Sequence, residues 1–381
     1  MPPSRPLPTV HRSVELIPSS DPTSNVRVNQ TAAVPPIPRS GTYTLIRILN
    51  TSLNPVDYKL ASLPQPLPRL LVGASPHTPG LDFVGRVWDT NDSRLKGGDI
   101  VWGYVSGSSR DGAAADFLVV KGQGWGGKIP DGWLEMSSRT GRSLAEFGAC
   151  GVAVYSALQP LLSGDLGFSR TWKAGGSNRA SGKGGKVFIN GGSGGVGTFA
   201  VQLAKHCFGC DAVVASCSGA NADLVKSLGA DEVIDYRSVN VVDALKQYVA
   251  KNGELDLVVD NVGSVDLYWN SHHFLKSGSA GGKFIMVGAT ISLQTMIDIP
   301  KMLLWPTVLG GGKRPVSLFA LIAVPPEQHD IVGQWMVEGR LRTVIEDENR
   351  FELTDIQKAF RKLQGGRTRG KISIQVNEDG R

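Results

Sequence analysis

Hydrophobic and polar positions follow two different patterns along the chain, and the second half has the clearer one. From Val187 onward, short apolar runs alternate with amphipathic stretches that have helical spacing. Short apolar runs are typical of buried parallel strands, and helical spacing is typical of helices that cover a sheet. The strands and helices expected in this order are Val187–Asn190, Thr198–Cys207, Ala212–Cys217, Ala222–Leu228, Glu232–Asp235, Val239–Tyr248, Leu255–Asp260 and Phe284–Val287. This alternation predicts a doubly wound parallel sheet with helices on both faces.

The first half of the chain has short strand-like runs between proline-rich turns and glycine corners. Strands are expected at Val10–Leu16, Val26–Asn29, Tyr43–Leu49, 97–103 and 112–120. Many short strands with such corners are typical of a small β-barrel.

The remaining segments connect or extend these two patterns. We expect a bridging helix at Ser143–Leu158 and a mobile surface insertion, rich in Gly, Ser and basic residues, at Ser163–Gly185. Further on, we expect strand Val316–Ile322, helix Pro326–Glu338, the segment Leu341–Ile345, helix Thr354–Leu363 and strand Lys371–Val376. The elements from Leu341 onward are expected to return to the first domain.

The stretch Lys186–Thr198, KVFINGGSGGVGT, combines a buried strand with a G-x-G-x-x-G motif and the start of an apolar helix. Such a turn leaves backbone N–H groups at the helix start without partners, and these N–H groups can hold a pyrophosphate. In this arrangement Gly192 allows the tight turn, Gly194 the close approach of the phosphate, and Gly197 the packing of helix on strand. Because 47 of the 381 residues are Gly, chance matches are expected. The strand before and the βαβ unit around it favour a dinucleotide site.

The second strand of this unit bears on the choice of cofactor. It ends Ala215-Ser216-Cys217-Ser218, without the Asp or Glu that usually binds the ribose 2′-hydroxyl of NAD. Ser218 and Asn221 are able to donate hydrogen bonds to a 2′-phosphate, so we expect NADPH. Gly219 and Ala220 stand where a basic residue is usual. Lys226 and Tyr236 are candidates for the missing contact, although Lys226 also fits a solvated helix position.

The carboxyl ends of the later strands are expected to border the nicotinamide. Asp260 and Asn261 follow one buried strand, and Gly288 follows the next. Ligands bind at such strand ends in doubly wound sheets. Asp260 is equally suited to cap the helix after it, and both roles are compatible.

Composition narrows the class of protein. A length of 381 residues suits two domains, and 41% hydrophobic with 19% charged residues is ordinary for a soluble globular protein. No apolar run approaches the roughly 20 residues of a membrane span. The proline-rich start MPPSRPLPTV predicts neither a secretory signal nor a transit helix, so we expect a cytoplasmic protein. The net charge of +6 is scattered except at Arg361–Lys371, and no nucleic-acid motif is present.

The chain has four cysteines, Cys150, Cys207, Cys210 and Cys217, which we expect to be free thiols. Cys207 and Cys210 form a C-x-x-C beside His206. No second ligand pair at zinc-finger spacing accompanies them, so packing is the favoured interpretation. We expect no catalytic role for His272 or His273.

Seven motifs, spread over nearly the whole chain, together resemble those of the medium-chain dehydrogenase/reductase superfamily. They are LNPVDYK (53–59), PGLDFVGRV (79–87), GGDIVWG (97–103), GGSGGVGT (191–198), SLGADEVIDY (227–236), DLVVDNVG (256–263) and GRTRGKISIQV (366–376). The chain is similar to the zinc-free quinone oxidoreductases and enoyl reductases, including the trans-acting enoyl reductases of fungal polyketide pathways. The resemblance implies an α/β protein with a GroES-like β-barrel catalytic domain (1–155 and 323–381), a Rossmann NADP-binding domain (156–322) and an active site between them.

The metal-site positions of this superfamily are altered here. Its zinc alcohol dehydrogenases have Cys and then Gly-His-Glu in the first domain, whereas this chain has Asn54 and Gly80-Leu81-Asp82. Cys150 lies near the third ligand position, but one thiolate does not build a tetrahedral site. The four-cysteine structural lobe is also absent from the sequence. We therefore expect no metal and no zinc-dependent alcohol oxidation, because nothing would polarise the alcohol.

Hydride delivery from NADPH to an already electrophilic carbon is the chemistry we expect without a metal. The favoured acceptor is the conjugated C=C bond of an enone or enoyl thioester, free or bound to a carrier, with an enolate as the first product. Three alternatives stay open: quinone reduction, a nucleotide-binding scaffold with little turnover, and reduction in trans on a polyketide synthase. Monomer and homodimer are both compatible with the sequence.

Lys59 and Tyr58 are the candidates for catalysis. Lys59 is suited to steady the enolate or a cofactor phosphate and Tyr58 to donate a proton, although both also suit simple packing and solvation. The cofactor contacts implied by the resemblance and the motif are Asn54, Val56, Asp57, Tyr58, Lys59, Gly192, Gly194, Gly195, Val196, Gly197, Thr198, Ser218, Gly219, Ala220, Asn221, Tyr236, Asn261, Val287, Gly288, Gly370 and Lys371.

Overall fold

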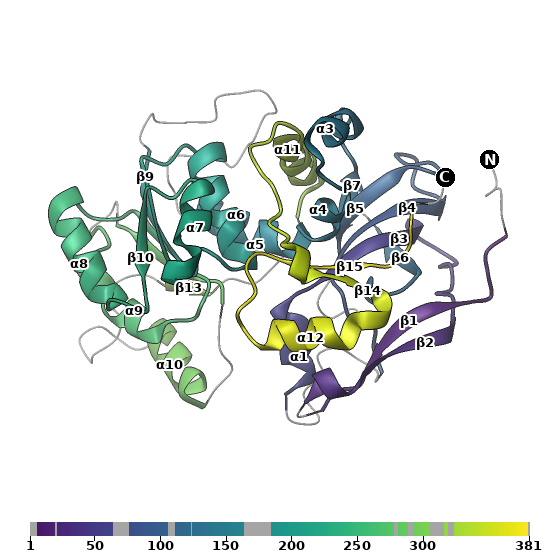
Figure 1. The fold of residues 1–381 in the computed structure, drawn as a ribbon, viewed down its shortest axis with the longest axis horizontal. Coiled ribbons are helices and arrows are strands. Elements are labelled where there is room, and N and C mark those ends of the chain that lie inside the picture. Colours follow the sequence, from purple (N-terminus) through teal and green to yellow (C-terminus); the bar gives the residue numbers. More distant parts are fainter. Residues whose placement is uncertain are drawn as a thin grey trace. The chain divides into compact units, whose positions relative to one another are not determined.

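A computed structural model describes residues 6–19, 21–63, 76–105, 111–122, 124–163, 184–277, 281–288, 293–304, 316–318 and 324–379. The chain forms two compact units (Figure 1). Unit 1 comprises Met1–Ala153 and Ala323–Arg381, and unit 2 comprises Val154–Ile322. Most of the insertion expected at Ser163–Gly185 lies outside the described residues. Among the described residues, no helix is both long and apolar enough to cross a membrane.

Unit 1 is built on a curved, mainly antiparallel sheet of seven strands in the order β14-β15-β3-β4-β5-β7, with β6 paired to β3. The strands are β3 (Tyr43–Leu53), β4 (Asp82–Thr90), β5 (Ile100–Tyr104), β6 (Phe117–Lys121), β7 (Gly126–Lys128), β14 (Arg350–Glu352) and β15 (Ile372–Gln375). The long strand β3 pairs with β15, β4 and β6, and two irregularities in its register with β4 bend it. A separate hairpin joins β1 (Val10–Leu16) to β2 (Val26–Ala33).

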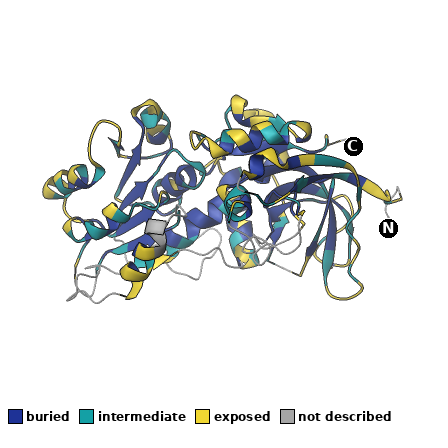
Figure 2. Ribbon diagram, turned by 90° about the horizontal axis from the view of Figure 1, so that it is seen from below, coloured by how far each residue is buried: buried dark blue, intermediate teal, exposed yellow. Residues whose placement is uncertain are grey.

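Helices cover the sheet of unit 1 and complete its core. They are α1 (Pro55–Ala61), α3 (Trp133–Thr140), α4 (Ala145–Gly148), α11 (Pro326–Val337) and α12 (Ile356–Gln364). Ile356, Ala359, Phe360 and Leu363 form the apolar face of α12 and are buried in the same cluster as Ile46 and Phe83 of the sheet. Figure 2 shows buried residues along the strands and exposed residues on the outer faces of the helices.

Unit 2 is a six-stranded sheet in the order β10-β9-β8-β11-β12-β13, and every neighbouring pair is parallel. Its strands are β8 (Lys186–Asn190), β9 (Ala212–Cys217), β10 (Glu232–Asp235), β11 (Leu257–Asp260), β12 (Lys283–Met286) and β13 (Val316–Leu318). Its helices include α6 (Gly195–Gln202), which continues as a π-helical turn (Leu203–Cys207), α7 (Ala222–Ser227), α8 (Val241–Asn252), α9 (Val265–Trp269) and α10 (Leu293–Leu304). The strand order reverses direction between β8 and β11, so the expected doubly wound fold is confirmed.

One expected helix is divided in the structure, and the segment Leu341–Ile345 is irregular. The single helix expected at Ser143–Leu158 is instead α4 followed by α5 (Gly151–Ser163). The segment Leu341–Ile345 lies in unit 1 and forms no regular strand. Its backbone groups bind side chains and the N–H of Lys371, which donates to the carbonyl of Val344 (2.8 Å). The backbone N–H of Thr343 donates to Glu146 Oε2 (3.1 Å), and the carbonyl of Leu341 accepts from Arg142 (2.9 Å). Only Ile345 makes an isolated bridge, to Gly370. Of the strand expected at Val316–Ile322, residues 319–322 lie outside the described residues.

Candidate functional site

The glycine loop of unit 2 lies between β8 and α6, at the switch in strand order. Gly191 has a φ of 78°, so Gly191 forms the tight turn and the expectation that Gly192 does so is wrong. Gly192 is required for a different reason. A Cβ on it would lie 3.0 Å from the Cβ of Ala215 and 3.2 Å from Cγ1 of Val225, so its missing side chain lets the loop pack on β9 and α7.

Gly194 and Gly197 differ in the space around them. A Cβ on Gly197 would overlap the carbonyl oxygen of Gly191, so α6 packs directly on the turn, as expected. A Cβ on Gly194 would have only the carbonyl oxygen of Gly191 near it, at 3.6 Å. Gly194 is the N-cap of α6 and provides no side-chain cap. The first N–H groups of a helix have no partners within it.

These N–H groups are accessible, because residues 193–196 are all partly exposed. An open N-terminus without a side-chain cap is the arrangement that accepts a phosphate. Thr198 does not add a donor, since its N–H donates to the carbonyl of Gly194 (2.9 Å) and its hydroxyl to that of Gly195 (3.1 Å). The N–H of Gly194 donates to the carbonyl of Gly191 (3.2 Å), so the loop fits a dinucleotide pyrophosphate at the N–H groups of Gly195 and Val196.

The residues expected near a 2′-phosphate lie together at the ends of β9 and β10. The N–H of Tyr236 donates to the carbonyl of Cys217 (3.2 Å), and Asn221 Nδ2 donates to Ser193 Oγ (3.1 Å). Gly219, Ala220 and Asn221 form a 3₁₀ turn. Tyr236 is exposed, whereas Ser218 is buried. The structure thus links this turn to the glycine loop through Asn221.

Asp235, at the end of β10, is a residue of this region that the sequence reasoning missed. A Cβ on Gly219 would lie 2.6 Å from its Oδ2, so Gly219 makes room for this carboxylate. Asp235 accepts from Ser238 Oγ (2.7 Å) and from the N–H of Arg237 (3.0 Å), and these bonds hold its pKa below the ordinary value. The signal was available in principle, because neighbouring parallel strands end at the same edge of a sheet.

At the ends of β8 and β11, buried polar groups shape the loop expected beside a nicotinamide. Asp260 is fully buried and accepts from Asn190 Nδ2 (2.8 Å) and from the N–H of Ser264 (2.6 Å), the N-cap residue of α9. Asp260 therefore holds the loop before α9, and the N-cap of α9 is Ser264, not Asp260. Asn261 Nδ2 donates to the carbonyl of Asn190 (3.0 Å), whereas Asn261 Oδ1 is buried without a partner among the described residues. This oxygen is an acceptor that a bound carboxamide could use.

Val287 and Gly288 hold this loop from β12. Both N–H groups donate to the carbonyl of Asp260, at 2.8 Å and 3.1 Å. A Cβ on Gly288 would overlap the carbonyl oxygen of Asn261, so only glycine allows this approach. The two residues therefore position Asn261.

In unit 1, the expected catalytic residues lie on α1. Tyr58 and Lys59 are half-buried, and Tyr58 packs against the hydrophobic core of the unit. Desolvation raises the pKa of the Tyr58 phenol and lowers the pKa of the Lys59 ammonium. Val56 is also half-buried on this helix. The phenol is therefore protonated at neutral pH.

Asp57 fixes the start of α1. Its carboxylate accepts from the N–H of Asn54 (2.7 Å) and of Gly80 (3.0 Å). Burial raises the pKa of Asp57 to about 6, against the opposing effect of these hydrogen bonds. Because backbone N–H groups bind both of its oxygens, Asp57 stabilises the start of α1 and the loop at Gly80, which are both in unit 1.

Asn54 and Lys371 also make their contacts within unit 1. The Lys371 ammonium is buried, with hydrogen bonds to Asn54 Oδ1 (2.5 Å) and Asp82 Oδ2 (3.1 Å). A Cβ on Gly370, whose φ is 66°, would overlap the carbonyl oxygen of Val344. Three residues expected to contact the cofactor, Asn54, Gly370 and Lys371, thus form structural contacts here.

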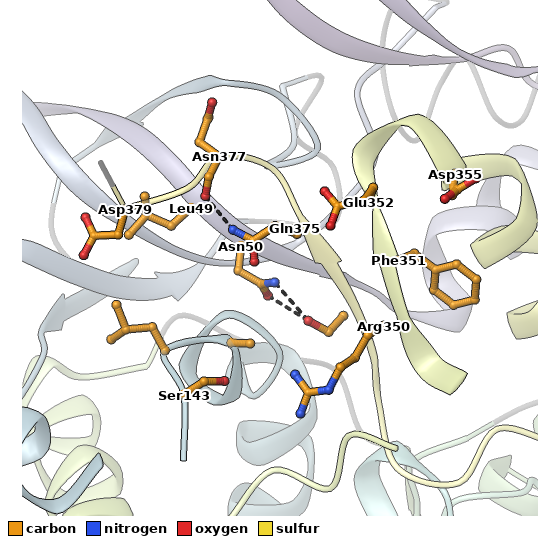
Figure 3. A pocket seen from close by; sticks show the side chains of 13 residues that line it. Leu49, Asn50, Ser143, Arg350, Phe351, Glu352, Asp355, Gln375, Asn377 and Asp379 are labelled. Carbon is orange, nitrogen blue, oxygen red and sulfur yellow. Dashed lines mark hydrogen bonds between the residues drawn. The ribbon is translucent and has the colours of Figure 1, made fainter. Parts of the chain in front are cut away.

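A separate pocket of about 510 Å³ lies in unit 1 beside β14 and β15 (Figure 3). Arg350, Glu352 and Asn377 line it, and Asn50 Nδ2 donates to Ser373 Oγ (2.9 Å) on its wall. None of the residues predicted for catalysis or cofactor binding lines this pocket.

Comparison with known proteins identifies the family. The trans-enoyl reductase pgmF of Aspergillus terreus is 35% identical over 373 residues, which cover 94% of this chain and 95% of that protein. The chain belongs to the enoyl reductase branch of the medium-chain dehydrogenase/reductase superfamily. A family model described as zinc-binding dehydrogenase matches residues 228–374.

Solved structures of this superfamily share the fold. The quinone oxidoreductase of Coxiella burnetii has a TM-score of 0.72 at 22% identity, covering 96% of this chain and 99% of that one. The Escherichia coli quinone oxidoreductase complexed with NADPH has a TM-score of 0.69 at 17% identity, covering 96% of this chain and 100% of that one. The expected pairing of a GroES-like barrel with a Rossmann sheet is therefore confirmed.

The zinc site suggested by the name of the family model does not fit the residues present. Cys150 is buried, its thiol donates to the carbonyl of Phe147 (3.4 Å), and burial raises its pKa well above the ordinary value. Across the described ranges, no three His, Cys, Asp or Glu side chains are arranged to hold a metal ion. All four cysteines are free thiols, as expected.

Two other sequence features have structural roles. Cys207 lies in the π-helical turn after α6 and Cys210 is buried beyond it. His272 and His273 stack on each other at 3.9 Å, and His272 Nδ1 is 3.1 Å from the carbonyl of Trp269.

Proposed function

We propose that the protein is a zinc-independent oxidoreductase that uses NADPH to reduce the conjugated C=C bond of an enone or enoyl thioester. The observation that carries the proposal is the open N-terminus of α6, where Gly194 provides neither a side chain nor a cap. An enoyl reductase relative along nearly the full chain supports the class of acceptor. Unit 2 is then the NADP-binding domain, unit 1 the catalytic domain, and the cytoplasm the proposed location.

The residues of unit 2 bind and orient the cofactor in this proposal. The N–H groups of Gly195 and Val196 hold the pyrophosphate, beside the open space at Gly194. Ser218, Asn221 and Tyr236 contact the 2′-phosphate, and Asn261 Oδ1 accepts a hydrogen bond from the carboxamide. When bound, NADPH supplies the hydride, which is transferred with its electron pair to the β-carbon of the acceptor.

The residues of unit 1 act on the acceptor. The positive charge of Lys59 steadies the negative oxygen of the enolate that forms when the β-carbon gains hydride. Tyr58, whose raised pKa keeps its phenol protonated, donates the proton that the α-carbon needs. One hydride and one proton convert C=C to CH–CH, and the tyrosinate regains its proton from water.

The test is steady-state oxidation of NADPH with an enone, an enoyl thioester and a quinone, after the affinities for NADPH and NADH are compared by titration. The proposal expects tighter NADPH binding and turnover with the enone or the thioester, with formation of the saturated product. Turnover only with the quinone favours the alternative supported by the solved quinone oxidoreductases. Binding without turnover favours a scaffold.

The relative's name supports one further candidate, reduction in trans of an acyl chain on a polyketide synthase. This candidate predicts a higher kcat/KM for an acyl chain on a carrier protein than for the same chain on a small thiol. Equal values for the two carriers contradict it.

A further inference from the structure

Asp82, at the start of β4, is a carboxylate with no exposed surface in unit 1. Its Oδ2 accepts from Ser52 Oγ (2.5 Å) and Asn54 Nδ2 (2.9 Å), and its Oδ1 accepts from the N–H of Val152 (2.5 Å). Burying a carboxylate is costly, and pairing it with a positive charge as well as with hydrogen-bond donors offsets that cost. A cation at this point therefore stabilises the buried charge.

The chain supplies that cation as the ammonium of Lys371, which is 3% exposed. It has three donors, and three acceptors surround it. They are Asn54 Oδ1 at 2.5 Å, Asp82 Oδ2 at 3.1 Å and the carbonyl oxygen of Leu53 at 3.5 Å. The ammonium is thus fully coordinated by oxygen atoms.

The four residues of this centre come from four elements. Lys371 directly precedes β15, Leu53 ends β3, Asp82 begins β4, and Asn54 is the N-cap of α1. The pairing of Ile372 with Leu53 and of Ser52 with Asp82 fixes this register. The ammonium therefore joins three strands to the start of the helix that carries Tyr58 and Lys59.

The same oxygen atoms have no capacity left for a metal ion. Asp82 accepts four hydrogen bonds, and the oxygen of Asn54 points to the ammonium. A divalent cation would also face the positive charge of Lys371 at close range. The family model described as zinc-binding dehydrogenase matches residues 228–374, so Lys371 is the only one of these four residues within the match.

We propose that the Lys371 ammonium is the resident cation of this centre, that it takes the place of a metal ion there, and that it positions Asn54 and hence α1. Lys371 is a positioning residue, since it acts through Asn54. The inference does not depend on which acceptor the enzyme reduces.

The first experiment measures zinc in the full-length wild-type protein. The protein is incubated with excess zinc sulfate, desalted and analysed by elemental mass spectrometry. We expect far less than one zinc per chain. One zinc per chain, retained after desalting, overturns the proposal.

The second experiment tests whether Lys371 and Asp82 stabilise the protein as a charge pair. It compares the Tm of the wild type with that of K371M, D82N and the double variant K371M/D82N. Each single variant leaves one buried charge without a partner, so its Tm falls well below that of the wild type, whereas the double variant regains most of the loss. K205M, which removes the partly exposed ion pair with Asp231, is the matched control and changes Tm little. A K371M variant as stable as wild type, or a double variant no more stable than K371M, contradicts the proposal.

Hydrogen exchange of the double variant tests the positioning role. Its α1 amides are expected to exchange faster than in the wild type, while those of α8 in unit 2 are unchanged, because Asn54 has lost its ammonium partner. Unchanged exchange in α1 contradicts this role. Neither zinc content nor exchange requires substrate, so their outcome is independent of the NADPH oxidation test.

Discussion

At the scale of single residues, the glycines between β8 and α6 are under different physical constraints. Gly191 is needed for its positive φ, and Gly197 because a side chain would overlap the turn. Gly194 has neither constraint, since its φ of −78° suits any residue and the space beside it is open. That open space is where the account places the pyrophosphate.

Replacing Gly194 by alanine is expected to separate binding from folding. The free energy of unfolding falls by only about 1 kcal/mol, because alanine is a poorer N-cap than glycine. The affinity for NADPH falls about tenfold or more, since the methyl group enters the phosphate position, a loss of about 1.4 kcal/mol or more. Denaturant unfolding and fluorescence titration measure the two quantities.

G197A is the matched control for this variant. Its methyl group overlaps the carbonyl oxygen of Gly191, so it lowers stability and NADPH affinity together. A G194A protein that binds NADPH as tightly as the wild type would contradict the placement of the phosphate.

The local motif was enough to predict this loop and the packing role of Gly197, because both follow from a strand that turns into a helix. The assignment of the tight turn to Gly192 failed, since the positive φ falls one residue earlier. The burial of Lys371 against Asp82 was beyond any local pattern, because 289 residues separate them. Asp235 was missed for a similar reason, as it approaches Gly219 from the neighbouring strand.

At the scale of elements, apolar periodicity predicted unit 2 well because its strands are buried on both faces and therefore appear as continuous apolar runs. The segment Leu341–Ile345 has no clear period and forms no regular strand. Arg142, before α4, binds the carbonyl of Leu341, and Glu146, within α4, accepts from the N–H of Thr343. The local sequence does not reveal these contacts.

Thr343 provides a test of this segment. Its hydroxyl donates to the carbonyl of Glu146 (2.7 Å) at a position that is 5% exposed. T343V keeps the shape but removes the donor, so the free energy of unfolding is expected to fall by about 1–2 kcal/mol. T354V, at an exposed position, is the control and is expected to change it by less than about 0.5 kcal/mol. Equal effects of the two variants in urea unfolding would contradict the role of this bond.

At the scale of the whole molecule, two buried groups in unit 1 make opposite contributions to stability as pH changes. Burial raises the pKa of Asp57 from 3.8 to about 6 and lowers the pKa of His329 from 6.5 to about 4. The contribution of Asp57 is present below pH 3.8 and is lost as pH rises to about 6. The contribution of His329 is present above pH 6.5 and is lost as pH falls to about 4. Each amounts to about 3 kcal/mol, so the two largely offset each other.

Two substitutions are expected to reveal this balance. D57N removes the group whose contribution to stability is larger at low pH. As pH falls from 6 to 4, the free energy of unfolding of this variant therefore decreases more steeply than that of the wild type. H329Q removes the opposing group, and its stability falls less steeply over the same range. Urea unfolding across that pH range measures both slopes. Parallel curves for the wild type and both variants would show that neither group titrates as the burial implies.

In the proposed reductase, unit 2 holds the nucleotide and unit 1 acts on the acceptor without zinc. The central claim is transfer of hydride from NADPH to a carbon of a conjugated C=C bond. It is tested most directly with NADPH that carries deuterium at both C4 positions, an enone or enoyl thioester, and protein freed of zinc by a chelator. The account predicts a saturated product with one deuterium, on the β-carbon, as determined by mass spectrometry and NMR. Saturated product without deuterium, or no product until zinc is restored, would contradict it.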